Sequence, residues 1–264
     1  MDNQTILIAF LLTVFAGLST GIGSLIAFMA KRTNTNFLSF ALGLSAGVMI
    51  YVSFMEMLPQ SLQYLTESFG DKTGMLYLIL GFFGGIILIA LIDFLIPESS
   101  NPHEMHGVEE MKKRNGLKQT GIITAITIAI HNFPEGIATF MSALTSLEIA
   151  IPITAAIAIH NIPEGIAVAV PIYHSTGSKK KAFWLSFASG LAEPLGAVIA
   201  FLFLIPFWST TLNAFVLSAV SGIMVYISLD ELLPSAEKYG KHHHSIIGLV
   251  IGMAAMAISL YLFI

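Results

Sequence analysis

Long apolar runs separated by short polar segments follow one another along the whole chain. An α-helix needs about 20 residues to cross the hydrocarbon core of a bilayer. Runs of about that length occur at 6–30, 37–58, 75–96, 119–143, 149–172, 182–205, 212–233 and 245–264. Polar segments such as KRTNTN, the stretch 59–73, the loop 97–118 and GSKKK separate them. The pattern predicts an all-α polytopic membrane protein with eight transmembrane helices.

The composition agrees with a membrane protein. The 264 residues are 55% hydrophobic and only 11% charged, whereas soluble domains carry about 25% charged residues. Cysteine is absent, which excludes disulfides and thiolate metal ligands. The first residues, MDNQT, are polar and acidic rather than basic, so we expect the first span to be retained rather than cleaved as a signal peptide.

Basic residues gather on one side of the predicted membrane. If the loops alternate between the two sides, one side holds 11 of the 12 Lys and Arg residues, and the other holds only Lys72. The 11 are Lys31, Arg32, Lys112, Lys113, Arg114, Lys118, Lys179, Lys180, Lys181, Lys238 and Lys241. Because basic residues collect in cytoplasmic loops, we expect a multi-pass protein of the cell membrane with both termini outside.

The chain contains an internal repeat. GVMIYVSFMEMLP at 47–59 matches GIMVYISLDELLP at 222–234, and AGLSTGIGSLIAF at 16–28 resembles SGLAEPLGAVIAF at 189–201. A displacement by five helices reverses the direction through the membrane, so the two copies should run oppositely, as in inverted-repeat transporters. We therefore expect a single transmembrane domain, 1–264, with a 3+2+3 plan. Its parts are repeat one at 6–96, a cytoplasmic loop at 97–118, a central helix pair at 119–172 and repeat two at 182–264.

Each helix of the central pair carries the same polar motif, HNFPEG at 131–136 and HNIPEG at 160–165. Within a helix, the histidine and glutamate of each motif are i and i+4, and the asparagine and glutamate are i and i+3, so the three side chains occupy one face. The motifs begin about 12 residues into their spans, or about 18 Å deep, near the middle of a core of about 30 Å. Glu193 of span six lies at a similar depth. Pro134, Pro163 and Pro194 cannot donate backbone hydrogen bonds, so we expect kinks that expose carbonyl groups beside these side chains.

These residues have the chemistry of a metal site. An ionisable side chain at the bilayer centre is costly and usually marks a binding site or pathway. Three carboxylates repel one another unless they share protons or surround a cation. Imidazole, carboxylate and amide groups suit first-row divalent ions, zinc among them, better than calcium. The candidate ligands are His131, Asn132, Glu135, His160, Asn161, Glu164 and Glu193. The alternatives are structural histidines and, for Glu193, a hydrogen bond between helices.

Acidic residues also lie near both predicted mouths. Inversion of the repeat places Glu56 at the outer end of its span and Asp230 and Glu231 at the inner end of theirs. An ion that travels inward would meet Glu56 first and the other two last, although hydrated interfacial acids would look the same. Histidines in the cytoplasmic loops either capture arriving metal or belong to ordinary polar loops. They are His103, His106, His242, His243 and His244.

The doubled HNxPEG motif, the glutamate-proline of span six and the 3+2+3 plan resemble the ZIP (Zrt/Irt-like) family of metal transporters, most closely its bacterial ZupT type. The resemblance covers essentially the whole chain. It implies uptake of divalent metal through a two-metal centre, and a homodimer. One ion would be held by His131, Glu135, His160 and Glu164. The other would be held by Asn132, Asn161 and Glu193, with Glu135 and Glu164 bridging. The family's histidine-bearing loop is short here, with only His103 and His106.

We therefore expect a transporter, not an enzyme, that moves zinc into the cytoplasm. Iron, manganese, cobalt and cadmium are alternative substrates, and no nucleic-acid partner is expected. The rival from another class is an intramembrane zinc-dependent hydrolase, whose typical signature is H-E-x-x-H. The observed H-N-x-P-E spacing instead uses every polar group as a ligand. A metal sensor that binds without transporting is the third reading.

Overall fold

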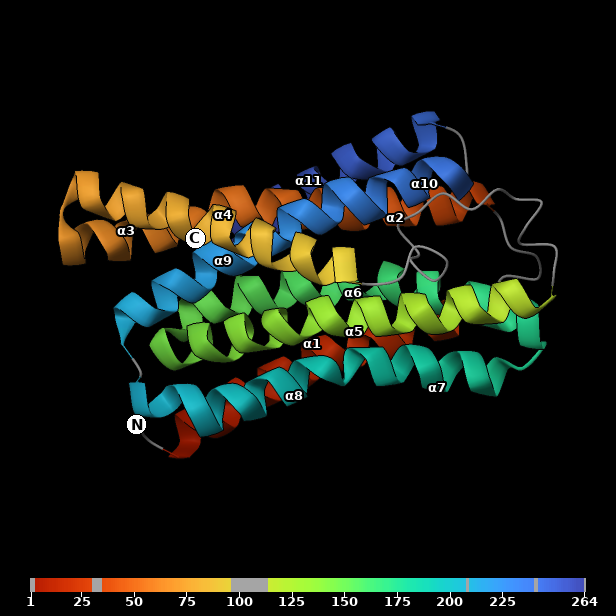
Figure 1. The fold of residues 1–264 in the computed structure, drawn as a ribbon, viewed down its shortest axis with the longest axis horizontal. Helices are drawn as coiled ribbons and strands as arrows, with labels where there is room; N and C mark the ends of the chain where they lie inside the picture. The colour runs from red at the N-terminus through yellow and green to blue at the C-terminus, as the bar shows by residue number, and fades with distance from the viewer. Residues whose placement is uncertain (1–2, 30–34, 96–113, 208, 240–241, 264) are drawn as a thin grey trace.

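The structure, a computed structural model, describes residues 3–29, 35–95, 114–207, 209–239 and 242–263. The described part is helical throughout, apart from short connections (Figure 1). Its longer helices are α1 (Asn3–Met29), α2 (Thr35–Val52), α3 (Leu58–Phe69), α4 (Asp71–Leu95), α5 (Arg114–Thr145), α6 (Leu147–Thr176), α7 (Lys179–Gly190), α8 (Ala192–Ile199), α9 (Thr210–Ile227), α10 (Leu233–Tyr239) and α11 (His242–Phe263). The prediction of an all-helical fold is confirmed.

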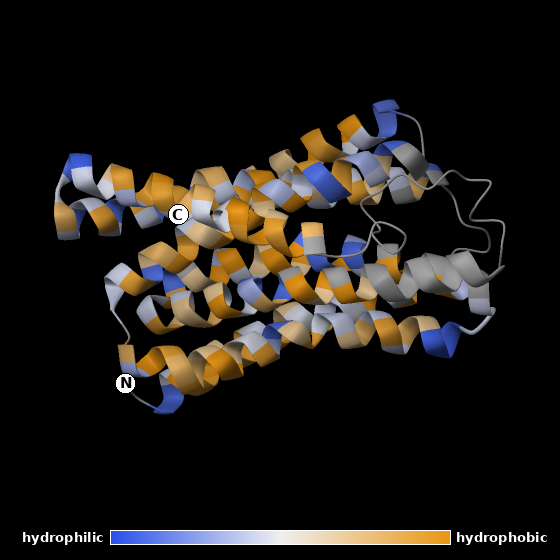
Figure 2. Cartoon of the chain, viewed as in Figure 1, coloured by the Kyte–Doolittle hydropathy of each residue, from blue (hydrophilic) through white to orange (hydrophobic). Residues whose placement is uncertain are grey.

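Six helical segments are long and apolar enough to cross a membrane. They are Asn3–Phe28, Ser39–Phe69, Asp71–Phe94, Lys179–Phe207, Thr210–Glu237 and His242–Leu262. Apolar residues cover much of these helices (Figure 2), and α4 and α11 expose most of theirs. The two helices that carry the HNxPEG motifs, α5 and α6, are outside this set, but they contain 32 and 30 residues. The described residues therefore form a polytopic membrane protein.

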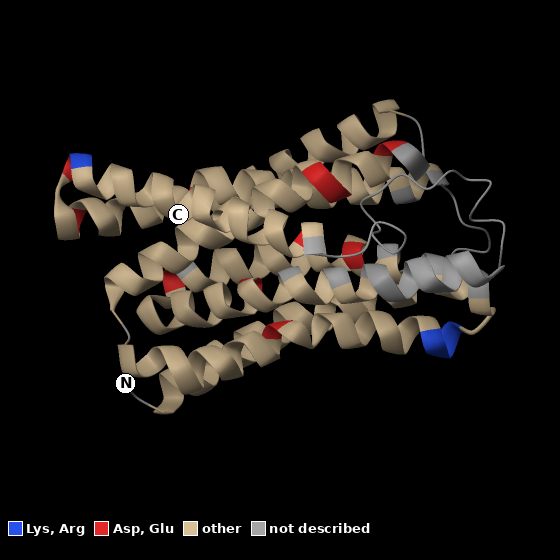
Figure 3. Ribbon diagram, viewed as in Figure 1, with Lys and Arg blue, Asp and Glu red and all other residues tan. Residues whose placement is uncertain are grey.

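The helices run along a common long axis, so the molecule has two distinct ends (Figure 1). At one end α3 turns into α4 through Gly70, whose φ of 80° suits glycine because it has no Cβ. The opposite end holds the start of α7. We call these the Gly70 end and the Lys179 end. Lys72 lies at the first, and Lys179, Lys180 and Lys181 lie at the second (Figure 3).

Two of the apolar spans contain a π-helical turn at matching positions. The turn η1 (Ser53–Met57) links α2 to α3, and η6 (Ser228–Leu232), 175 positions later, links α9 to α10. Each is followed by a proline, Pro59 or Pro234, which has no N–H to offer the carbonyl four residues earlier. In each turn the N–H that follows instead bonds the carbonyl five residues earlier. The segment 59–73, expected only as a polar break, is thus helical except at Gly70, where α3 ends and α4 follows.

Span six is interrupted in its middle, as the proline there predicts. Helix α7 ends at Gly190, and α8 begins at Ala192, one residue before Glu193 and two before Pro194. Pro194 cannot donate to the carbonyl of Gly190, so the regular ladder of hydrogen bonds stops there. In contrast, α5 is continuous through Pro134 and α6 through Pro163. Kinks at these two residues remain a prediction.

Close helix pairs organise the bundle. Helix α2 packs against α11 and α4 against α9, whereas α1 packs against α6 and α5 against α8. Glycine permits several of these approaches, because a Cβ at Gly85 would strike the carbonyl of Ala219 and one at Gly252 would strike that of Leu44. Helices α5 and α6 also pack against each other, which places the two motifs side by side within the bundle.

Candidate metal centre

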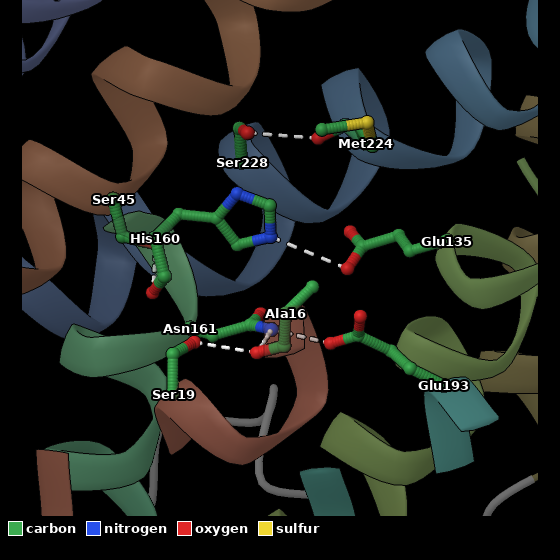
Figure 4. Close-up of polar contacts among 9 residues, drawn as sticks. All are labelled: Ala16, Ser19, Ser45, Glu135, His160, Asn161, Glu193, Met224 and Ser228. Carbon is green, nitrogen blue, oxygen red and sulfur yellow. Dashed lines mark hydrogen bonds and ion pairs between the residues drawn. The ribbon is translucent and has the colours of Figure 1, made fainter. Parts of the chain in front are cut away.

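The polar residues of the two motifs lie inside the bundle, between α5, α6 and α8. The side chains whose surroundings are described are fully buried. They are Asn132, Glu135, His160, Asn161, Glu164 and Glu193. The backbone of His131 lies in α5, but its side chain is outside the described part of the structure. Figure 4 shows side chains from α5, α6 and α8 converging on one region. Six of the seven predicted ligands are therefore buried in the same part of the fold.

Two polar contacts join α5 to α6. The Nε2 atom of His160 lies 3.2 Å from Oε2 of Glu135. The Asn132 amide, turned so that its nitrogen faces acceptors, donates to Oε2 of Glu164 at 3.2 Å and to the carbonyl of Ile128 at 3.0 Å. Each helix thus gives a carboxylate to a polar side chain of the other, as the shared faces of the motifs predict.

Asn161 brings the third glutamate into this region. Its Nδ2 donates to Oε1 of Glu193 on α8 and to the carbonyl oxygen of Ala16 on α1, the latter at 2.9 Å (Figure 4). Ser45 of α2 donates to the carbonyl of His160 at 3.3 Å. The bond to Glu193 is the hydrogen bond between helices that was the alternative for this residue, so its role as a metal ligand stays a prediction. The contacts of Ala16 and Ser45 were not predicted. No sequence signal marks Ala16, since it contributes only its backbone carbonyl.

The region brings three carboxyl groups together. Three fully buried carboxylates, those of Glu135, Glu164 and Glu193, come from three neighbouring helices. Among the described residues, Oε1 of Glu135 and Oε2 of Glu193 have no hydrogen-bond partner. A buried carboxylate oxygen without a donor is costly. A divalent cation between these helices would neutralise the repulsion and use these oxygens as ligands.

The described side chains do not form a complete metal cage by themselves. Within the described part of the chain, which leaves out the side chain of His131, no three His, Asp or Glu residues gather closely enough to hold an ion. The polar groups instead form pairs across helices, with asparagine amides between them. The two-metal arrangement therefore remains a prediction, and it would need His131 or small side-chain rotations.

The glycine that ends each motif lets a neighbouring helix come close. A Cβ at Gly136 would strike the carbonyl oxygen of Glu193, and one at Gly165 would strike that of Thr20. Only glycine permits such approaches between helix backbones. The sequence analysis missed both glycines, although their repetition after each glutamate was a visible signal. The alignment of 16–28 with 189–201 pairs Thr20 with Glu193, and these two residues make equivalent contacts with glycine here.

The predicted mouth residues lie on the π-helical turns rather than on the central helices. Glu56 is in η1, on the Gly70 side, and is half-buried. Asp230 and Glu231 are in η6, toward the Lys179 end, where Glu231 is buried and Asp230 half-buried. Their placement agrees with the predicted opposite ends. A role in conducting an ion remains a prediction.

The predicted loop histidines divide into two sets. His103 and His106 lie outside the described residues. His242, His243 and His244 form the first turn of α11 at the Lys179 end, and Nδ1 of His242 lies 2.7 Å from Oε1 of Glu237. This pair is exposed, and the ring of His243 lies 5.7 Å from that of His242. A carboxylate that holds one ring nitrogen leaves the other free to bind metal.

Comparison with known proteins decides the family. The profile described as "ZIP Zinc transporter" matches residues 97–260. The chain belongs to the ZIP zinc transporter family. Named relatives of this ZIP chain include the zinc transporter ZupT of Streptococcus mutans, 60% identical over 99% of this chain and 100% of the relative. The ZupT proteins of Oceanobacillus iheyensis and Clostridium perfringens are 57% and 55% identical, with at least 99% of each sequence covered.

ZIP membership confirms the resemblance seen in the sequence. The relatives are named as transporters rather than enzymes, which supports the prediction that this chain is not an enzyme. The intramembrane hydrolase is not favoured. The matched region, residues 97–260, contains both HNxPEG motifs and Glu193, so the family match includes every predicted ligand of the centre.

Proposed function

We propose that this protein carries zinc across the cell membrane into the cytoplasm through the centre between α5, α6 and α8. The observation that carries the proposal is the set of fully buried His, Asn and Glu side chains there. Such groups are costly in a membrane protein unless they bind something. ZIP relatives that are 55–60% identical over nearly their whole length are named zinc transporters, which supports zinc as the substrate. Iron, manganese, cobalt and cadmium remain alternatives that the ligand chemistry permits.

The centre would hold two ions. His131, Glu135, His160 and Glu164 would bind one, and Asn132, Asn161 and Glu193 the other, with Glu135 and Glu164 bridging. Three carboxylates leave a net negative charge around one divalent ion, and a second ion would reverse it. The pairs Glu135–His160 and Asn161–Glu193 would have to open toward the ions. These contacts support the proposal because they place nitrogen and oxygen ligands together in a buried site.

The fold would consist of eight membrane spans in an inverted repeat. Helices α5 and α6, with 32 and 30 residues, are about 45 Å long, ample for a core of about 30 Å. The repeat is supported by glycine contacts that recur in matched pairs. A Cβ at Gly17 would strike the carbonyl of Gly190, and one at Gly190 would strike that of Gly17. The contacts of Gly165 with Thr20 and of Gly136 with Glu193 are related in the same way.

The Gly70 end would face outside and the Lys179 end the cytoplasm. Lys179, Lys180 and Lys181 at the second end support this orientation (Figure 3), which places the start of α1 and the end of α11 outside. Zinc would then pass Glu56 before the centre, and Asp230 and Glu231 after it. The exposed apolar faces of α4 and α11 would contact lipid or, in the homodimer that the resemblance implies, a second copy.

Zinc uptake into proteoliposomes tests the proposal. We expect radioactive zinc to accumulate with the wild type, and uptake to be lost in Glu164→Ala. The matched control is Glu148→Ala, which removes an exposed carboxylate from the same helix and should transport normally. Competition by iron, manganese and cadmium would rank the substrates. Equal uptake by Glu164→Ala and wild type would contradict a transport role for the centre.

The same preparation separates the remaining readings. Folded wild-type protein that binds zinc in detergent but accumulates none in vesicles would be a sensor rather than a transporter. Cleavage of peptides without zinc flux would restore the hydrolase. We expect neither result, because the chain and its named relatives match over at least 99% of both lengths.

A further inference from the structure

Helix α5 carries buried hydroxyl groups beyond the metal centre. Thr139 and Ser142 follow Glu135 by four and seven positions, so all three lie on one face of the helix, in the half toward the Gly70 end. Both side chains are fully buried. Neither hydroxyl oxygen has a hydrogen-bond partner among the residues that the structure describes. Thr145, in contrast, donates to the carbonyl of Met141 at 3.1 Å, the usual bond of a helical threonine.

Neighbouring helices extend this set of polar groups. Thr154, in the same half of α6, is 2% exposed, and its hydroxyl also has no partner within the described residues. At the Gly70 end, Asn213 of α9 is buried and donates to Oγ1 of Thr145 at 3.1 Å. The Oδ1 atom of Asn213 has no partner in the described part of the chain. Buried polar groups therefore occur at several levels in this half of the bundle, between Glu135 and the first turn of α9.

Helix packing alone does not account for the hydroxyls. The two motifs are 29 positions apart. A residue of α5 therefore corresponds to the residue of α6 that lies 29 positions later in the sequence. Val168 corresponds to Thr139, and Ala125 corresponds to Thr154; both counterparts are buried and apolar. Pro171 corresponds to Ser142. Because valine has nearly the same shape as threonine, an apolar residue fills the equivalent space in the other half of the bundle.

A buried hydroxyl without a hydrogen-bond partner destabilises the fold, so its presence in a native protein calls for a functional explanation. In a membrane-spanning helix such groups are tolerated where they line a cavity or a path for a polar solute. A hydroxyl oxygen can also replace a water molecule in the hydration shell of a divalent cation. The hydroxyls lie on the same face of α5 as Glu135, whose Oε1 atom likewise has no partner among the described residues.

We propose that Thr139, Ser142 and Thr154 form a hydroxyl track along which a partly hydrated divalent cation moves between the Gly70 end and Glu135. The hydrogen bond from Asn213 to Thr145 lies at the outer end of this track. The track lies in only one half of the central pair, so it serves one side of the membrane. This inference rests on the proposed transport function and adds residues to its entry path.

The isosteric substitution Thr139→Val tests the track. It removes an unpartnered hydroxyl and keeps the shape, so we expect a melting temperature equal to or above that of the wild type, and unchanged zinc binding in detergent. Zinc uptake into proteoliposomes should fall about tenfold, the change expected for loss of one favourable polar contact made to the ion or to its bound water. The matched control, Val168→Thr, adds a hydroxyl at the equivalent place outside the track and should take up zinc like the wild type.

Each outcome of this comparison decides the question. Normal uptake by Thr139→Val, or an equal loss in Val168→Thr, would overturn the track. If Glu164→Ala abolishes uptake in the same series, the proposed function stands although the track fails. If the wild type itself accumulates no zinc, both fail together.

The absence of cysteine permits a second, independent test. Thr139→Cys and Val168→Cys each introduce a single thiol, which an impermeant charged thiol reagent added to intact cells can reach only through water. We expect the Thr139→Cys variant to react faster than Val168→Cys, and zinc to slow its reaction. Equal reaction of the two variants, both still able to take up zinc, would overturn the track.

Discussion

Gly165 offers the sharpest test of how the centre is held together. An added Cβ there would overlap the carbonyl oxygen of Thr20 and lie 3.2 Å from the Cα of Gly23. Both atoms belong to the backbone of α1, so no side-chain rotation can relieve the collision. Because carbon–oxygen contacts are normally about 3.3–3.6 Å, α1 and α6 would have to separate by on the order of 1 Å.

The free-energy change follows from two opposing effects. Overpacking costs about 1–3 kcal/mol, and a collision between backbones belongs at the upper end of that range. Alanine is favoured over glycine in a helix by about 1 kcal/mol. We therefore expect Gly165→Ala to lower the free energy of unfolding by about 2 kcal/mol. The adjacent Glu164 would move with α6, and binding groups must stay within about 0.5 Å of their productive positions, so zinc uptake should also fall.

The control is Gly84→Ala on α4, where an added Cβ meets no atom within 4 Å. This variant should gain up to about 1 kcal/mol from helix propensity and transport normally. Denaturant unfolding in detergent measures both variants against the wild type. The packing argument is wrong if Gly165→Ala is as stable as the wild type, or if Gly84→Ala loses as much.

Three further predictions follow from the polar contacts and from the orientation. Asn161→Ala removes the donor to the Glu193 carboxylate and one of the donors to the Ala16 carbonyl, which Ser19 also bonds at 2.6 Å, so unfolding in detergent should require about 2–4 kcal/mol less; unchanged stability would contradict these bonds. His242→Ala should abolish weak zinc binding in a calorimetric titration and leave zinc uptake unchanged. A binding isotherm identical to that of the wild type would exclude metal capture by His242. In the cysteine-free chain, Lys72→Cys should react with an impermeant reagent outside intact cells and Lys180→Cys should not; the reverse result would invert the orientation.

Much of the fold could be predicted because the membrane restricts the choices. Hydrophobic runs place the helices, and the spacing of HNxPEG places its polar residues on one face. The predicted span 119–143, for example, lies within α5, which extends from Arg114 to Thr145. Contacts between helices could not be predicted in the same way. The approach of Gly165 to Thr20 and the bond from Asn161 to Ala16 depend on which helices become neighbours, and that choice is made by the whole bundle.

The departures from the repeat indicate where the two sides of the protein differ. Equivalent glycines make equivalent contacts, so the close packing of the helices is similar on the two sides of the membrane. The ligands and the hydroxyls are not repeated in this way. Thr20 occupies the position that corresponds to Glu193, and Val168 the position that corresponds to Thr139. A strictly symmetric protein would present the same path to an ion from either side of the membrane. We therefore expect exchange of Thr139 and Val168, in one double variant, to change the rates of zinc entry and exit unequally, while substitutions of the shared glycines change both alike.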